Sequence, residues 1–121
     1  LQTHSLELQV QGFPPVKAGQ KIISENEKSN HLYWCVEGRF KVVSKVKGIP
    51  IELNQIGPNE LIGELSFIDQ KPRSATVQAI NDCELVKLDY KDFRDMFESQ
   101  PKWMKKIVDT LVTKVRDLSE F

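Results

Sequence analysis

The sequence has few of the residues on which metal sites and disulfide frameworks depend. It contains two histidines, His4 and His31, and two cysteines, Cys35 and Cys83. The histidines are far apart and have no partner at metal-ligand spacing, so we expect both to be solvated, with no metal or other cofactor. The cysteines lie in apolar, strand-like segments and nothing indicates an oxidising compartment, so we expect two reduced core residues in a cytoplasmic protein.

Net charge and long apolar runs are also lacking. The 17 basic residues are balanced by 17 acidic residues. Surfaces that bind nucleic acid are usually basic, so we expect this domain to make no nucleic-acid contact. No apolar run approaches the length of a membrane span, and there is no signal-peptide pattern. The chain begins with Leu1 rather than methionine, and we therefore expect a piece of a longer protein.

Arrangements typical of catalysis are missing as well. The sequence has no nucleophile elbow, no Cys/His pair and no paired carboxylates of the catalytic kind. A metal-dependent enzyme of the cupin type would share a β-barrel but would need clustered histidines. We therefore expect a binding domain rather than an enzyme. At 121 residues, with 40% hydrophobic content, the chain is long enough for one domain with a modest core.

Short apolar segments separated by turns dominate residues 16–88. They predict a mainly β fold with flanking helices, in the form of an eight-stranded antiparallel jelly-roll barrel. Lys47-Gly48 predicts a hairpin, Pro50 places the strand after it at an edge, and Asn26 suits a left-handed turn position. The expected strands include Leu6–Val10, Lys21–Ser24, Leu32–Val36, Arg39–Val46, Ile49–Ile56, Ser74–Ile80 and Cys83–Leu88.

Two helices are expected after the last strand, over residues 89–121. The first runs from about Tyr90 to Glu98, with Asp89 as a capping residue and Asp92 three positions on. The second starts at Pro101 and runs towards Glu120. Two interpretations of its apolar stripe stay open: it covers the barrel, or it forms a dimer seam. The stripe consists of Met104, Val108, Leu111, Val115 and Leu118.

The stretch from Gly57 to Val77 carries the site chemistry. Gly63 lets the backbone approach a ligand, and a helical turn starting at Glu64 would present unpaired amides to an anion. The planar guanidinium of Arg73 suits a phosphate, whereas the Glu64 carboxylate suits sugar hydroxyls. A phosphate and a sugar together suggest a nucleotide.

Ile-Gly-Glu-Leu-Ser at residues 62–66 and Pro-Arg-Ser-Ala-Thr-Val at residues 72–77 resemble the phosphate-binding cassette of the cyclic-nucleotide-binding domain family. Ile62 replaces the usual phenylalanine. The resemblance implies that Glu64 accepts from the ribose 2′-hydroxyl and that Arg73 pairs with the cyclic phosphate. The backbone amides implied to line the phosphate cradle are those of Gly63, Leu65, Ser66, Ser74 and Ala75.

The resemblance also implies a role. The chain is expected to be one cyclic-nucleotide-binding domain, with a lead-in at residues 1–15, a barrel at 16–88 containing the cassette at 57–77, and helices at 89–121. It would sense cyclic AMP in preference to cyclic GMP, with cyclic GMP as the alternative because Ser74 alone does not decide between them. The last helix would pass occupancy to an attached or partner module and form a homodimer. The alternative is a ligand-free interaction or dimerisation module with the same barrel.

Overall fold

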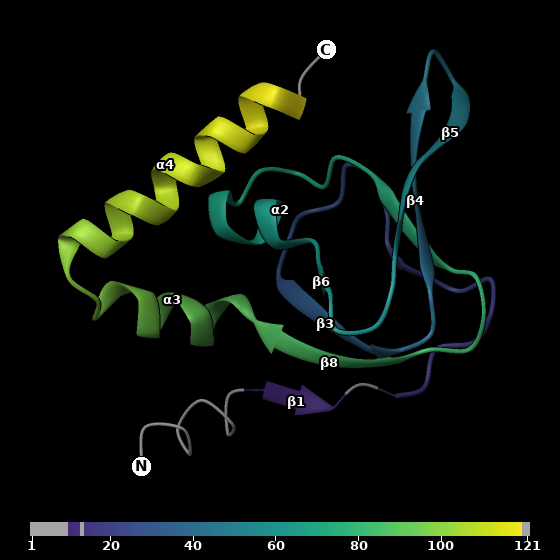
Figure 1. Ribbon diagram of the computed structural model, residues 1–121, viewed down its shortest axis with the longest axis horizontal. Coiled ribbons are helices and arrows are strands. Elements are labelled where there is room, and N and C mark those ends of the chain that lie inside the picture. Colours follow the sequence, from purple (N-terminus) through teal and green to yellow (C-terminus); the bar gives the residue numbers. More distant parts are fainter. Residues whose placement is uncertain (1–9, 13, 120–121) are drawn as a thin grey trace.

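The computed structural model describes residues 10–12 and 14–119, and its strands form two four-stranded antiparallel sheets (Figure 1). In the first sheet the order is β1 (Val10–Gly12), β8 (Glu84–Asp89), β3 (His31–Glu37) and β6 (Leu61–Ile62). In the second sheet the order is β2 (Lys21–Ile23), β7 (Thr76–Ala79), β4 (Phe40–Val46) and β5 (Ile49–Ile56). The mainly β class with C-terminal helices is therefore confirmed.

A closed barrel is not confirmed. Within the described residues, the two sheets share no strand pairing that would join their edges into a ring. Three of the four edge strands are short, since β1 and β2 have three residues each and β6 has two. Such short strands offer too few backbone groups to pair on both sides. Of the strand expected at Leu6–Val10, all but Val10 lies outside the described residues.

The turn chemistry confirms three local predictions. Lys47 and Gly48 both have positive φ, 53° and 79°, as a two-residue hairpin turn requires. The strand that follows contains Pro50 and lies at the edge of its sheet. Asn26 has φ 72° and adopts the left-handed conformation. The Lys47-Gly48 turn brings β5 back along β4.

The core lies between the two sheets and follows from alternation along the strands. In β3, which is central as expected, Tyr33 and Cys35 point inward, whereas Trp34 remains 47% exposed on the outer face. Cys35 and Cys83 are both buried and unbridged, as the sequence predicts. The buried cluster comprises Val16, Ile23, Tyr33, Cys35, Phe40, Ile56, Ile62, Val77, Ala79, Cys83 and Leu85.

Three helices are described: α2 (Glu64–Asp69), α3 (Tyr90–Glu98) and α4 (Lys102–Ser119). The bounds of α3 match the prediction, and Asp89 occupies its N-cap position. The predicted side-chain cap is wrong, because Asp89 makes no capping hydrogen bond. Its Oδ1 atom instead lies 2.9 Å from Nε2 of His31. The expectation of a merely solvated His31 is therefore also wrong, whereas His4 lies outside the described residues.

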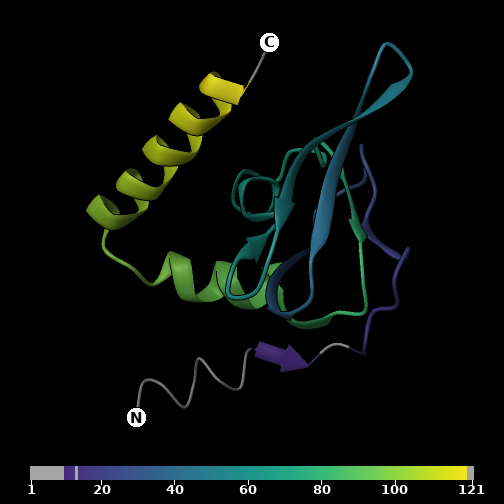
Figure 2. The same cartoon turned by 45° about the vertical axis from the view of Figure 1, so that its right-hand side comes forward.

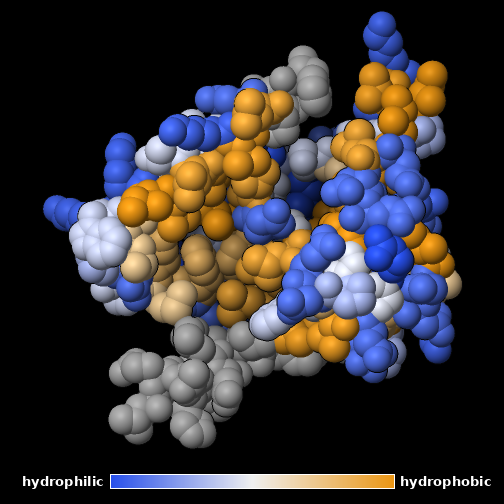
Figure 3. Space-filling model, in the orientation of Figure 1, coloured by the Kyte–Doolittle hydropathy of each residue, from blue (hydrophilic) through white to orange (hydrophobic). Residues whose placement is uncertain are grey.

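The last helix, α4, does not cover the sheets with its apolar stripe. Both ribbon views place α2 between α4 and the strands (Figures 1 and 2). Leu111 and Leu118 are 57% and 81% exposed, and Val112 is the buried apolar residue of the helix. Hydrophobic side chains accordingly form a visible band along α4 (Figure 3). Among the described residues, no helix combines the length and apolar character needed to span a membrane.

Candidate functional site

A pocket of about 420 Å³ opens between the cassette and the second sheet. It brings together all seven residues that the sequence singles out, from a helix start and a loop ten residues further along. Its lining from the cassette includes Gly63, Glu64, Leu65, Ser66, Arg73, Ser74 and Ala75.

The pocket has two chemically different ends. The cassette contributes the polar side chains, among them two carboxylates, a guanidinium and two hydroxyls. The second sheet contributes apolar side chains from β2, β4, β5 and β7, including Val42 and Val77. A ligand that matches this division has a charged or hydroxylated part and a flat or apolar part.

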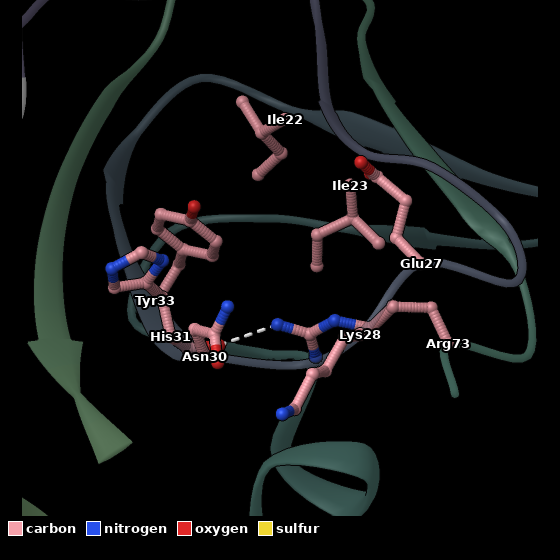
Figure 4. Close-up of a pocket in the computed structure, with 8 residues that line it drawn as sticks. All are labelled: Ile22, Ile23, Glu27, Lys28, Asn30, His31, Tyr33 and Arg73. Atoms are coloured by element: carbon pink, nitrogen blue, oxygen red, sulfur yellow. Dashed lines mark hydrogen bonds between the residues drawn. The ribbon is translucent and has the colours of Figure 1, made fainter. Parts of the chain in front are cut away.

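Arg73 is the buried charge of the site, with 6% of its surface exposed. Its Nη1 donates to the carbonyl of Gly63 at 2.8 Å, and its Nη2 donates to the carbonyl of His31. Figure 4 shows the side chain reaching from its loop toward His31 at the edge of a second pocket, of about 220 Å³. A guanidinium has five N–H donors, so three remain beyond these two bonds.

Two backbone hydrogen bonds hold the main chain of Arg73 in place. The Arg73 amide donates to the carbonyl of Glu27 at 2.8 Å, and its carbonyl accepts from the Asn26 amide at 2.8 Å. Burial lowers the pKa of Arg73, and the charges of Tyr33, Glu27 and Glu64 act in the opposite direction. An arginine remains protonated under such conditions, so the site holds a positively charged donor beside the pocket.

The start of α2 faces the same pocket. The first amide to pair within the helix is that of Phe67, which donates to the Gly63 carbonyl at 3.2 Å. The amides of Glu64, Leu65 and Ser66 precede this bond and have no carbonyl four residues back within the helix. Gly63 itself has φ 80°, a conformation that glycine adopts without strain.

The remaining predicted residues differ in exposure. Glu64 and Ser74 are exposed at the pocket, Leu65 is partly buried, and Ser66 and Ala75 are buried. The Ser66 side chain is used internally, because its Oγ lies 3.5 Å from the carbonyl of Pro72. Glu64 is therefore an exposed carboxylate at the pocket, as is Glu60.

A link between α4 and α2 was missed by the sequence analysis. Arg116 donates from Nε to Oδ2 of Asp69 at 2.8 Å and from Nη2 to Oδ1 at 3.2 Å. The same Nη2 lies 3.0 Å from Oγ of Ser66. Burial raises the pKa of Asp69, but the hydrogen bonds from Arg116 and the Lys71 amide outweigh it and leave the pKa lowered. Periodicity gives no signal for such a pair, which spans 47 residues.

The second sheet also contributes lining residues that the motif does not indicate, notably Leu53 and Asn54 of β5. The hairpin turn was a usable signal for Leu53, because its position fixes the register of β4 and β5 next to the turn, whereas Asn54 reaches the pocket only through a later shift in that register. No residue of α4 lines the pocket in the described part of the chain. Among the same residues, no three His, Cys, Asp or Glu side chains form a group that could hold a metal ion.

Comparison with known proteins identifies the class of this site. The model of the cyclic nucleotide-binding domain family matches residues 14–100. Lysophospholipase NTE1 of Chaetomium globosum is 33% identical over 105 residues, which cover 85% of this chain and 7% of that protein. The cAMP-activated global transcriptional regulator CRP of Salmonella typhimurium is 29% identical over 101 residues, which cover 82% of this chain and 48% of CRP.

Solved structures agree with the family match. The regulatory domain of Toxoplasma gondii PKA, solved with cAMP, superimposes with a TM-score of 0.72 at 26% identity, covering 78% of this chain and 37% of that one. The chain therefore belongs to the cyclic nucleotide-binding domain family. It spans less than half the length of either curated relative, so it corresponds to one part of such proteins. Domains of this family are regulatory rather than catalytic, also where, as in the lysophospholipase, they are part of an enzyme.

Proposed function

We propose that this chain is a cytoplasmic regulatory domain that binds a cyclic nucleotide, preferably cyclic AMP, in the cassette pocket. The observation that carries the proposal is the buried guanidinium of Arg73 beside a pocket with one polar and one apolar end. CRP, by its name, is activated by cAMP, and the Toxoplasma gondii PKA domain was solved with cAMP. Two reduced cysteines fit a cytoplasmic setting, and a net charge of zero fits a domain that does not bind nucleic acid.

Each end of the pocket suits one part of the ligand. The free N–H donors of Arg73 pair with the cyclic phosphate, and the first amides of α2 together with those of Ser74 and Ala75 complete the cradle. Glu64 accepts from the ribose 2′-hydroxyl, because a carboxylate repels the phosphate and suits a hydroxyl donor instead. The purine lies against the apolar side chains of the second sheet.

Occupancy is passed on through α2. The helix that lines the pocket is the one that Arg116 ties to α4, so a ligand that favours one position of α2 also favours one position of α4. Such a shift requires different affinities for the two arrangements. The exposed side chains of Leu111 and Leu118 would then form the seam of a homodimer or meet an output module.

Calorimetric titration with cyclic AMP tests the proposal. Arg73→Ala would leave the desolvated phosphate without its charged partner and should cost about 2–5 kcal/mol of binding free energy. Arg73→Lys should recover only part of it, because an ammonium lacks the planar fork. Thermal unfolding of each variant serves as control, because Arg73 also donates hydrogen bonds to two backbone carbonyls and its loss could destabilise the fold. Unchanged affinity in a folded Arg73→Ala would refute the site, and a folded wild type that binds no cyclic nucleotide would favour a ligand-free module.

A further inference from the structure

Two consecutive residues of β5, Leu53 and Asn54, both line the pocket. In a regular strand, consecutive side chains point to opposite faces of the sheet, so one of them would face away. The pairing of β4 with β5 shows why this strand departs from the rule. The register shifts between Val42 and Val43, which face Asn54 and Glu52, and Leu53 is the additional residue of a β-bulge.

The bulge decides which face Asn54 occupies. From the Lys47-Gly48 turn onward the pairs run regularly from Val46 with Ile49 to Val43 with Glu52. Continued without the bulge, that register would place Leu53 opposite Val42 and Asn54 opposite Lys41. Lys41 lines a different hollow, on the opposite face of the sheet. The extra residue instead brings Asn54 opposite Val42, which lines the candidate pocket.

Asn54 is chemically distinct from its surroundings. It is the only polar side chain that the second sheet contributes to the pocket among the described residues, and its neighbours there include Val42, Leu53 and Ile56. Its Oδ1 accepts from the amide of Gln55 at 2.8 Å, which fixes the orientation of the side-chain amide. The Nδ2 donors and the second lone pair of Oδ1 remain for a ligand.

We infer that Asn54 is the specificity-determining residue for the base, and that it favours adenine over guanine. The inference rests on the proposed function and deepens it. In this arrangement Oδ1 accepts from the exocyclic amino group at the purine six-position, while Nδ2 donates to the adjacent ring nitrogen. A side-chain amide makes this pair of bonds with adenine, whose six-position is a donor. Guanine presents an acceptor at the six-position, and turning the amide to match it would break the bond to Gln55.

Competition calorimetry with cyclic AMP, cyclic GMP and cyclic IMP measures the effect. Wild type should bind cyclic AMP roughly tenfold more tightly than cyclic GMP, the worth of about one hydrogen bond. Cyclic IMP has the six-position of guanine without its 2-amino group, so it should be disfavoured like cyclic GMP. This arm separates reading of the six-position by Asn54 from any contact that Ser74 makes with the 2-amino group.

Three variants decide the outcome. In Asn54→Leu the preference should fall to about twofold or less. In Asn54→Asp the donor is lost and a negative charge weakens all three nucleotides alike, so the ratio of affinities is the relevant readout. Gln55→Leu is the matched control, because it removes an amide from the neighbouring position on the opposite face and leaves the backbone donor to Asn54 in place. It should keep the wild-type ratio.

The outcomes separate this inference from the proposed function. An unchanged ratio in Asn54→Leu, or a wild type that binds the three nucleotides equally, would overturn the role of Asn54 while leaving nucleotide binding at Arg73 intact. A ratio that falls equally in Gln55→Leu would likewise overturn it, since the effect would then be a general one of β5. Loss of all nucleotide binding in the folded wild type would instead refute the proposed function itself.

Discussion

Arg73 and Gly63 are in such close contact that a side chain on the glycine would displace the guanidinium. The guanidinium Nη1 donates to the Gly63 carbonyl at 2.8 Å, and a Cβ on Gly63 would lie 2.2 Å from the same nitrogen. No pair of non-bonded atoms tolerates that distance, so either the arginine or the backbone would have to move. The glycine of the cassette therefore positions the charge of the site as well as shaping its turn.

Gly63→Ala should weaken nucleotide binding by at least tenfold, because it displaces the Arg73 guanidinium; calorimetry measures the loss. The control is Gly48→Ala in the β4–β5 turn, where φ is nearly the same, 79° against 80°, and nothing lies within 4 Å of the added carbon. Both variants carry the backbone strain of a left-handed alanine, about 1–2 kcal/mol. Equal effects of the two on affinity would show that strain alone, not the contact with Arg73, is responsible.

Glu64 should accept a hydrogen bond from the ribose 2′-hydroxyl. We expect 2′-deoxy cyclic AMP to bind wild type more weakly than cyclic AMP by about 1.5–3 kcal/mol, since a hydrogen bond to a carboxylate is lost. Glu64→Ala should bind the two nucleotides about equally in the same titration. Glu60→Ala is the control, because this second carboxylate lines the pocket outside the helix. If the deoxy analogue loses as much in Glu64→Ala as in wild type, another group contacts the hydroxyl.

The Arg116–Asp69 pair should stabilise the docking of α4. A double-mutant cycle with Arg116→Met and Asp69→Asn should give a coupling free energy of about 1–3 kcal/mol in chemical unfolding, as expected for a charged hydrogen bond with little exposure. The exposed pair Arg94–Asp95 is the control and should give at most about 1 kcal/mol. Similar coupling in the two cycles would argue against the interhelical link.

The same pair predicts a dependence on pH. The pKa of Asp69 is lowered in the folded protein, so its contribution is fully present above the unfolded value of about 4 and is lost as the pH falls below it. The difference in melting temperature between wild type and Asp69→Asn should therefore be largest near neutral pH and shrink below about pH 4. A difference that stays constant across this range would contradict the lowered pKa.

Exposure of the α4 stripe predicts association. Leu111→Glu should shift a dimer to a monomer in sedimentation while the β-sheet signal in circular dichroism stays unchanged, because the side chain is 57% exposed in the single chain. Thr113→Glu adds the same charge to another exposed face of α4 and should leave the dimer intact. A wild type that remains monomeric at high concentration would exclude the seam and leave α4 available to a different partner.

Local chemistry in the sequence was sufficient for much of the fold. The positive φ of Asn26, the Lys47-Gly48 hairpin, the edge position of Pro50 and the bounds of α3 all follow from the conformational preferences of a few adjacent residues. The cassette was recognised by its resemblance to the motif of a known family, whose glycine, carboxylate and arginine lie within eleven residues of this sequence.

Only the tertiary structure decided where more distant groups meet. Asp89 had a local use as a helix cap, but the folded sheet places it beside His31, and the contact between the two side chains prevails. Arg116 reaches Asp69 across 47 residues, and the bulge that turns Asn54 into the pocket arises from the pairing of two whole strands. Whether the edges of the sheets close was decided in the same way. Periodicity specifies which face of an element is apolar, whereas packing of the entire chain determines which partner that face or charge finds.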